Sequence, residues 1–378
     1  MSTSNTLSIP VPVRSLNSLL VVAPISRAVG AIIVALPLLT AACGDGAGNS
    51  TGTVTDDNRN GITATGPGVL SVSPLDTSTL IATTPLGALA PPGHVLPTDH
   101  VYMYFVDPWS GQQQNNDCSA RAVRAAGSGV VTFVLVTEVG RTDTKVDVQM
   151  TKTFHYYYDH VVLRPGIGVG THVSAGDTIA YTTGRCPSMD LGVTDSDVSP
   201  SGFVNPSRYE GSTGHAASPY KYFAEPLRSW LYAHVRVYEG VPANKDGRID
   251  YGVRGKLVGD WFHSSIASST SSTTMGPDGW PKTISFAYDW FDNKPRISVG
   301  GTITDAGVLR ISATDPDPAS VSTANGLVAY QTTSTLGRIV SGWMLVQMIS
   351  DERIRVEYFA AATSRPGAFT VAAQEYVR

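Results

Sequence analysis

The chain has 378 residues, 42% of them hydrophobic and 15% charged, and its formal net charge is −4. This length suffices for two domains. The 27 Lys and Arg residues stand against 31 Asp and Glu residues and form no basic patch or arm. This pattern argues against nucleic-acid binding, because such binding needs clustered cations to displace counterions.

The N-terminal segment has the order of an export signal. Residues 1–42 contain Arg14 and Arg27 but no acidic residue, and they include an apolar run over residues 28–39. This order predicts a secretory signal peptide, and the run is too short to span a membrane. The letters Leu-Thr-Ala-Ala before Cys43 resemble a bacterial lipoprotein processing box. The resemblance implies a lipid on Cys43 and a membrane-anchored lipoprotein of the cell envelope or periplasm. The alternative is an ordinary signal peptide cut nearby.

Two further cysteines remain in the exported chain. Cys118 and Cys186 are expected to form a disulfide, because an exported protein folds in an oxidising compartment. Such a bond would close a long loop and contribute ~4 kcal/mol on the chain-entropy model. Two free buried thiols are the alternative.

A polar segment precedes a region of strand-like runs. Residues 43–75 are rich in Gly, Ser and Thr and show no apolar period, which predicts a flexible tether. Short runs rich in Val, Tyr and Thr and bounded by Gly and Pro then follow, and they predict strands. Within residues 76–215 these runs are 101–106, 129–136, 145–150, 161–163 and 178–181.

One helix is expected between two β-rich regions. It runs from Tyr220 to Tyr238, after a serine cap and a proline at the first helical position. Residues 216–249 are therefore predicted to be a helical connector.

The region after the connector, residues 250–378, contains about eight strand-like runs, the last of them at residues 368–371. Runs at this spacing predict a second antiparallel β-barrel or sandwich domain. The predicted fold class of the whole chain is all-β.

The densest group of potential metal ligands lies in the stretch from Gly93 to His100, which contains His94, Asp99 and His100. Zinc binds imidazole nitrogen and carboxylate oxygen, and a catalytic zinc needs three protein ligands and one open position. This stretch could supply two ligands. A third would come from residues 154–160 or 189–195, which also hold His and Asp.

Two other segments carry a resemblance to known families. Residues 121–136 look like a "V-x-A-x-x-x-G-x-V" strand pair, and residues 165–184 look like a "V-x-x-G-D-x-I-G" segment. Both resemble barrel-sandwich proteins such as lipoyl domains and lysostaphin-like (LytM-type) zinc endopeptidases. The histidine-rich stretches on either flank favour the endopeptidases. The resemblance implies a barrel-sandwich fold, the duplicated hybrid motif, for residues 76–215.

The resemblance also implies roles for particular residues. His94 and Asp99 stand where the family has its first two zinc ligands, with one residue more between them, and His160 stands where it has a catalytic histidine. In the closing His-x-His motif, Ser188 and Asp190 replace both histidines, so Asp190 becomes the third metal ligand. Loss of one oxyanion-stabilising group commonly costs ~10²–10³ in rate.

Three functions are compatible with these patterns. The first is an envelope lipoprotein whose LytM-like domain is degenerate and non-catalytic and binds cell wall, that is peptidoglycan, or a partner protein. The second is an active zinc-dependent peptidoglycan endopeptidase with an altered ligand set, in which His100 or His155 substitutes from a shifted position. The third is a carrier of a small apolar ligand in the C-terminal β-domain.

Overall fold

The computed structural model describes residues 61–378 except 108, 110–117, 137–142, 184–186 and 268–278. These residues all belong to one compact unit, Asp56–Arg378. The predicted signal peptide, the predicted lipidation site Cys43 and Cys186 lie outside the described residues. The disulfide between Cys118 and Cys186 therefore stays a prediction.

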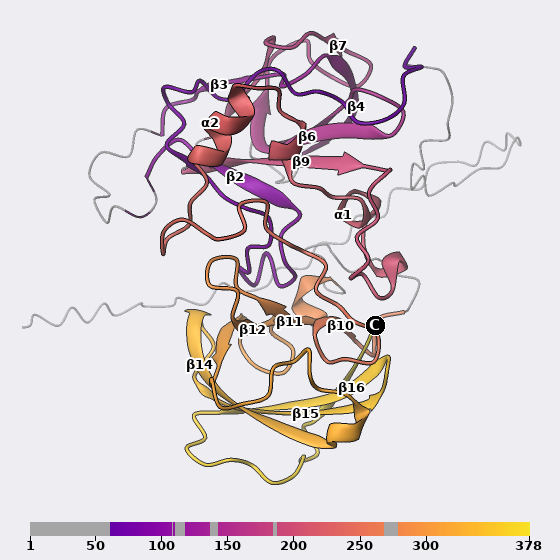
Figure 1. The fold of residues 1–378 in the computed structure, drawn as a ribbon, viewed down its shortest axis with the longest axis vertical. Helices are drawn as coiled ribbons and strands as arrows, with labels where there is room; N and C mark the ends of the chain where they lie inside the picture. The colour runs from indigo at the N-terminus through magenta and orange to yellow at the C-terminus, as the bar shows by residue number, and fades with distance from the viewer. Residues whose placement is uncertain (1–60, 108, 110–117, 137–142, 184–186, 268–278) are drawn as a thin grey trace, which may run out of the picture. The chain divides into compact units, whose positions relative to one another are not determined.

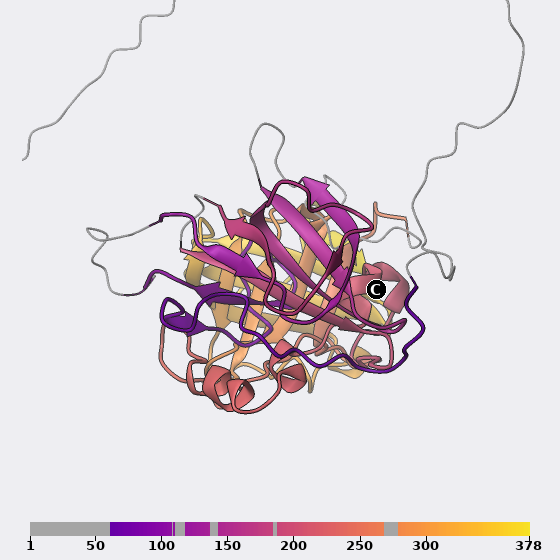
Figure 2. The ribbon, with the colours of Figure 1, turned by 90° about the horizontal axis from the view of Figure 1, so that it is seen from above.

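The first domain is a β-sheet built from short antiparallel strands (Figure 1). Its strands are β1 Ala82–Thr83, β2 His100–Tyr104, β3 Ala122–Arg124, β4 Gly129–Val136, β5 Thr144–Gln149, β6 Phe154–Leu163, β7 His172–Val173, β8 Thr178–Thr182 and β9 Ser188–Asp195. Their order across the sheet is β1-β2-β9-β6-β5-β4-β7, and β8 pairs with both β3 and β6. Strands β2, β9 and β6, which are far apart in the sequence, therefore lie side by side, as Figures 1 and 2 show.

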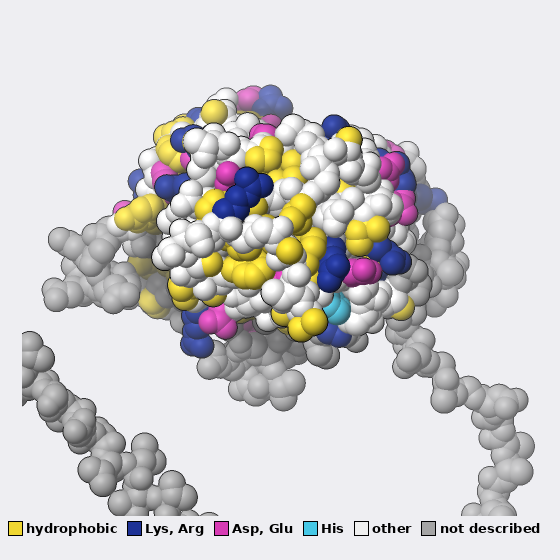
Figure 3. Space-filling view, turned by 90° about the horizontal axis from the view of Figure 1, so that it is seen from below, with side chains coloured by type: hydrophobic (Ala, Val, Ile, Leu, Met, Phe, Trp, Pro, Cys, Tyr) yellow, Lys and Arg dark blue, Asp and Glu magenta, His cyan; other side chains and the backbone are white. Residues whose placement is uncertain are grey.

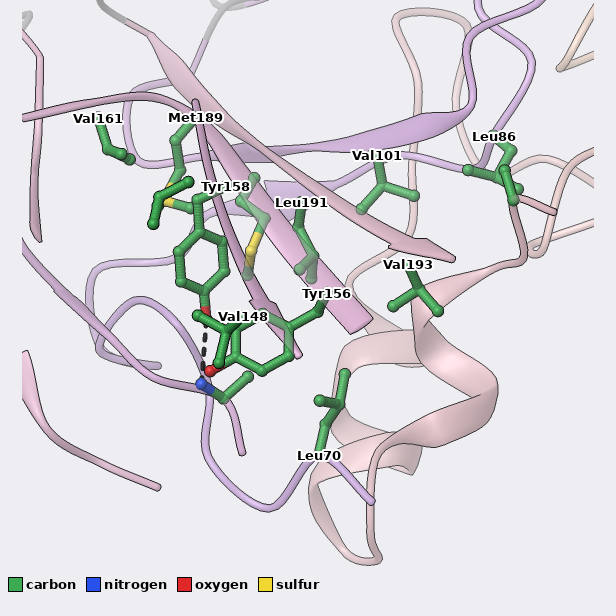
Figure 4. Close-up of a cluster of buried hydrophobic side chains, with 14 of the residues drawn as sticks. Leu70, Leu86, Val101, Val148, Tyr156, Tyr158, Val161, Met189, Leu191 and Val193 are labelled. Atoms are coloured by element: carbon green, nitrogen blue, oxygen red, sulfur yellow. Dashed lines mark hydrogen bonds between the residues drawn. The ribbon is translucent and has the colours of Figure 1, made fainter. Parts of the chain in front are cut away.

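One face of this sheet forms the core of the first domain (Figure 4). Met189, Leu191 and Val193 on β9 are buried beside Tyr156 and Tyr158 on β6. Both tyrosine hydroxyls donate to backbone carbonyls, Tyr156 to that of Gly127 and Tyr158 to that of Arg124. Because side chains alternate between the two faces of a strand, the intervening residues of β9 and β6 point to the opposite face, where the polar side chains gather.

The second domain is a closed antiparallel barrel, which confirms the predicted all-β class. Its strands are β10 Gly259–His263, β11 Thr283–Tyr288, β12 Pro295–Val299, β13 Gly307–Ile311, β14 Leu327–Gly337, β15 Gly342–Ser350, β16 Arg353–Ala360 and β17 Gln374–Val377. Fully buried side chains such as Trp261, Phe286 and Tyr330 fill its core.

The last barrel strand differs from the prediction. The expected strand at residues 368–371 is a loop, and β17 follows it at Gln374–Val377. The loop is fixed through a side chain, because the backbone N–H and the hydroxyl of Thr370 both donate to the Glu357 carboxylate. The N–H and hydroxyl of Thr370 therefore have hydrogen-bond partners without pairing to a neighbouring strand.

The connector between the domains is helical but broken. Its helical segments are the 3-10 turn η4 Pro219–Tyr222 and the helix α2 Leu227–Ala233. The 3-10 turn η3 Pro206–Arg208 and the helix α1 Gly211–Gly214 precede it at the end of the first domain, and η5 Trp280–Lys282 and η6 Thr323–Asn325 lie in the barrel domain. The continuous helix expected from Tyr220 to Tyr238 is therefore wrong. Pro226 interrupts it, because proline lacks an N–H and disfavours helical geometry in the residue before it.

The start of the first domain also shifts. Leu70 and Leu75 are fully buried although they lie in the predicted tether of residues 43–75. The Leu70 N–H donates to the carbonyl of Tyr222 over 2.9 Å. The first domain therefore begins before residue 76.

Among the described residues, no helix is long and apolar enough to cross a membrane. On the face in Figure 3, acidic and basic side chains are interspersed with hydrophobic ones.

Candidate metal centre

A cavity of about 400 Å³ lies over the polar face of the sheet. Strands β2, β6 and β9 provide its floor, and residues 93–99, helix α1 and the barrel provide its other sides. Strand register explains why the floor is polar, because Tyr102 and Asp159 are both direct neighbours of Asp190 in the sheet. The three sequence segments that carried the ligand prediction therefore meet here.

The Asp190 carboxylate lies between two imidazole rings. Its Oδ2 atom is 3.3 Å from Nε2 of His100 and 3.6 Å from Nε2 of His160. His160 has a positive φ of 62°, which breaks the alternation of β6, since this backbone region is rare outside glycine. Two histidines from different strands therefore turn the same ring atom toward one carboxylate.

A second carboxylate stands behind each ring. Asp99 lies 2.9 Å from Nδ1 of His100, and Asp143 lies 3.0 Å from Nδ1 of His160. Because a carboxylate accepts a hydrogen bond, each Nδ1 carries the proton, which leaves each Nε2 free to act as a ligand when the ring is neutral. Metal-binding histidines in proteins are oriented in this way.

Asp99 is itself held by donors other than His100. It accepts hydrogen bonds from the hydroxyls of Tyr157, at 3.1 Å, and Thr213, at 2.5 Å. Tyr157 reaches Asp99 across β9 because Gly192 has no side chain, and a Cβ there would lie 2.0 Å from the Tyr157 ring. Burial raises the pKa of Asp99, but the hydrogen bond and charge of His100 outweigh it, so the net pKa is lowered.

His94 differs from the other two histidines of the cavity. Burial, together with the charge of His100, lowers the pKa of His94 to about 3, so its imidazole is neutral at physiological pH. Its ring centroid lies 5.1 Å from the ring of His100 and 5.1 Å from the ring of Trp280. A neutral imidazole is the form that ligates metals.

The pKa values of His100 and His160 move the other way. Burial lowers both, but nearby carboxylates outweigh it and the net pKa of each is raised, with Asp190 as the main opposing charge. Without a metal, the positive charge of the protonated rings balances the negative charge of the carboxylates. A divalent cation would supply the same compensation.

The donors fit a metal ion on two counts. Both Nε2 of His100 and Oδ1 of Asp190 are buried without a hydrogen-bond partner, and unsatisfied buried polar atoms are costly unless something binds them. Moreover, metal–ligand distances of 2.0–2.2 Å imply roughly 3.3–3.6 Å between neighbouring ligand atoms of a tetrahedral zinc site. The two separations at Asp190, 3.3 and 3.6 Å, are close to this range.

Among the described residues, the three donors whose ligand atoms all lie close enough together for one metal ion form a different, overlapping group. Ligand atoms of Asp143, Asp159 and His160 lie within 4.8 Å of one another. The Oδ1 atom of Asp159 accepts the backbone N–H of His160 at 2.7 Å. This group shares His160 with the first, so both belong to one carboxylate and histidine cluster.

The structure places the predicted site residues around one cavity, and one of them makes a different contact from the one expected. His94, Asp99, His160 and Asp190 all line the cavity. His100, which the sequence offered only as a substitute, contacts Asp190 directly, whereas Asp99 acts behind it. The other substitute, His155, is not among the lining residues and lies 3.7 Å from Asp147.

Ser188, at the position of the family's other histidine, is likewise not among the lining residues. It begins β9 and pairs with Tyr104.

Sequence patterns missed several residues of the site. Asp143 contacts His160, and Tyr157 and Thr213 donate hydrogen bonds to Asp99, yet none of the three belongs to a recognisable motif. The only available signal was Gly192, a glycine inside a strand pattern, which often marks a close approach by another group.

No protein-family model and no curated protein matches this sequence. Among solved structures, Csd3 from Helicobacter pylori is 18% identical, with 44% of this chain and 40% of that chain covered and a TM-score of 0.28. A zinc-containing peptidase from Vibrio cholerae is 18% identical, with 34% and 37% covered and a TM-score of 0.26. The catalytic domain of lysostaphin from Staphylococcus simulans is 16% identical, with 31% and 80% covered and a TM-score of 0.22.

These likenesses are partial. The chain spans less than two thirds of Csd3 and of the Vibrio cholerae peptidase. Peptidases are thus among the similar structures, but TM-scores this low establish neither a family nor a shared fold.

Proposed function

We propose that this protein is an exported envelope lipoprotein whose first domain binds zinc through His100, His160 and Asp190. The cavity beside these three residues binds a peptide of the cell wall or of an envelope protein. It does not cleave this peptide as LytM-type enzymes do. The carrying observation is the Asp190 carboxylate placed between two Nε2 atoms, each on a ring oriented by its own carboxylate.

Zinc in this place would polarise a carbonyl oxygen of the bound peptide. The residues of the chain prepare for such a ligand. Asp99 and Asp143 fix the two rings, and His94 adds an uncharged imidazole beside them. Lys145 lines the cavity and offers a cation to a carboxylate or carbonyl of the peptide.

The absence of turnover is proposed from Ser188. A LytM-type enzyme has an imidazole at that position, and the serine here is not among the cavity-lining residues. Removal of one group that stabilises a developing oxyanion commonly costs ~10²–10³ in rate. Slow or no release of peptides from peptidoglycan is therefore expected.

Metal analysis of the purified mature chain tests the zinc claim. Wild type is expected to bind about one zinc ion per chain, and His100→Ala and Asp190→Ala are expected to lose it. His172→Ala is the matched control, because His172 is exposed on β7. Zinc retained by His100→Ala and Asp190→Ala would overturn the proposed ligand set.

Cosedimentation with purified peptidoglycan tests the binding claim. Wild type should sediment with the wall material, and Asp190→Ala or prior chelation of zinc should release it. Soluble peptides are measured in the same supernatants. Wild type that stays in solution in the presence of zinc would refute wall binding and leave an envelope protein as the ligand.

An active hydrolase is the second candidate, and Glu210 favours it. Glu210 lines the cavity, and burial raises its pKa, as is usual for a carboxyl that serves as general acid or base. If this candidate holds, wild type with zinc releases peptides from peptidoglycan, and Glu210→Gln abolishes release but retains zinc.

Export and lipidation are proposed from the sequence alone. Cells that express the full chain in the presence of labelled palmitate should yield a labelled product. Cys43→Ala should yield an exported product without label. An unlabelled wild-type product would leave the alternative of ordinary signal-peptide cleavage.

A further inference from the structure

The barrel supplies part of the wall of the metal cavity. Trp280, in the turn η5 that precedes β11, and Asp260 on β10 both line it. The Trp280 ring lies 5.1 Å from the ring of His94, at an interplanar angle of 54°. The cavity is thus formed by both domains.

The barrel is held against the first domain by buried contacts. The Tyr209 hydroxyl donates to Oδ2 of Asp260 at 2.8 Å, and both residues are buried. The fully buried Arg208 donates from Nη1 to the carbonyl of Ala267 at 2.7 Å. Phe262 of β10 belongs to the same buried cluster as the core of the first domain. Because polar and apolar contacts both cross this junction, the barrel wall has a fixed position.

Trp280 is also fixed within the barrel. The Thr283 hydroxyl donates to the Trp280 carbonyl at 2.8 Å, and the Thr302 hydroxyl donates to the Pro281 carbonyl at 2.5 Å. A Cβ at position 300 would lie 1.9 Å from the Trp280 carbonyl, so Gly300 permits this close packing. The indole is therefore presented by rigid backbone.

We infer that the C-terminal barrel completes the ligand site and that Trp280 is a specificity-determining residue, because its indole covers His94 and limits what can reach that side of the cavity. The cover over His94 is a property of the fold. Its consequence for ligand choice rests on the proposed function, in which the ligand is a peptide segment.

Chemical modification measures the cover directly. Diethyl pyrocarbonate modifies accessible imidazoles, so its rate of reaction with His94 reports how far Trp280 covers that ring. In the wild-type mature chain, peptide mapping by mass spectrometry should show slow modification at His94 and fast modification at the exposed His172. In Trp280→Ala, modification of His94 should rise several-fold while that of His172 stays unchanged.

Two further variants and one control keep this result interpretable. Trp280→Phe should stay near wild type because it retains a ring, and Trp280→Leu should open the site with a smaller loss of apolar contact. Trp290→Ala is the control, since Trp290 lies outside the metal cavity and lines a separate one. Circular dichroism and thermal melts report folding of each variant. A folded Trp280→Ala or Trp280→Leu with His94 still protected overturns the inference.

Failure of the inference is distinguishable from failure of the proposed function. The modification experiment uses metal-free protein, so its outcome does not depend on zinc. Where zinc binding is established, Trp280→Ala should keep its zinc and change its affinity for peptides released from peptidoglycan. Unchanged affinity in a variant with exposed His94 would show that Trp280 covers the ring without selecting the ligand.

Discussion

Nε2 of His100 lies 3.3 Å from Oδ2 of Asp190, with both residues on adjacent strands β2 and β9. Both side chains are almost fully buried, and the facing nitrogen and the other carboxylate oxygen have no hydrogen-bond partner. A buried arrangement of this kind is costly unless a proton or a metal ion joins the two groups.

Removal of the carboxylate behind His100 should weaken zinc binding without removing a ligand. In Asp99→Asn we expect zinc affinity to fall about 10–100-fold, the usual effect of losing such a partner. Competition with a chelator of known affinity measures the change. Asp305→Asn, at an exposed loop position, should retain wild-type affinity. Equal affinities for the two variants would mean that Asp99 does not orient the ring.

Gly192 should tolerate no side chain. In Gly192→Ala the new methyl group would lie 2.0 Å from the Tyr157 ring, so either Tyr157 or β9 must move. We expect a loss of about 1–3 kcal/mol in the free energy of unfolding, measured by denaturant titration. Gly168→Ala is the control, because a Cβ there meets nothing within 4 Å. A Gly192→Ala protein as stable as this control would contradict the close packing.

Asp260 should make stability depend on pH. Burial raises the pKa of Asp260 to about 6, despite hydrogen bonds from Ser285 and Tyr209. Because an unfolded Asp titrates near ~3.9, the folded protein holds a proton that the unfolded chain has released. The free energy of unfolding therefore falls as pH rises from about 4 to about 6 and stays lower above that range.

Asp260→Asn should remove this loss. We expect the variant to be more stable than wild type by about 1–3 kcal/mol near pH 8, with a much smaller difference near pH 4. Thermal melts at the two pH values provide the measurement. A difference of the same size at both would show that Asp260 is not the titrating group.

Zinc should reverse the pH dependence that His100 and His160 impose. Nearby carboxylates raise the pKa of both rings. Without metal, their contribution to stability is complete below the unfolded value of ~6.5 and is lost as pH rises through the folded values. With zinc, the rings must lose their protons to bind, so stabilisation by zinc should grow as pH rises. Melting temperatures measured across this range with zinc and with a chelator should show opposite trends.

The sequence alone could predict the strands and which segments carry the site, but not how the site is assembled. Runs rich in Val, Tyr and Thr located the barrel strands, and the order of motifs brought His94, His160 and Asp190 together. The contact between His100 and Asp190 was not predictable, because it depends on Tyr157 and Thr213 holding Asp99 behind the His100 ring. These contacts join segments that share no local pattern.

The position of Trp280 in the wall of the cavity could not be predicted from the sequence either. Its position depends on how the barrel packs against the first domain, through contacts such as the hydrogen bond from Tyr209 to Asp260. No periodicity within either domain encodes that packing. The break at Pro226, in contrast, was readable from the sequence, because an internal proline is unfavourable in a helix.

Zinc-edge anomalous diffraction from crystals of the mature chain grown with zinc tests the central claim most directly. The account predicts one strong anomalous peak within bonding distance, about 2.0–2.2 Å, of Nε2 of His100, Nε2 of His160 and a carboxylate oxygen of Asp190. The absence of a peak among these three side chains, with the hydrogen-bonded arrangement unchanged, would contradict it.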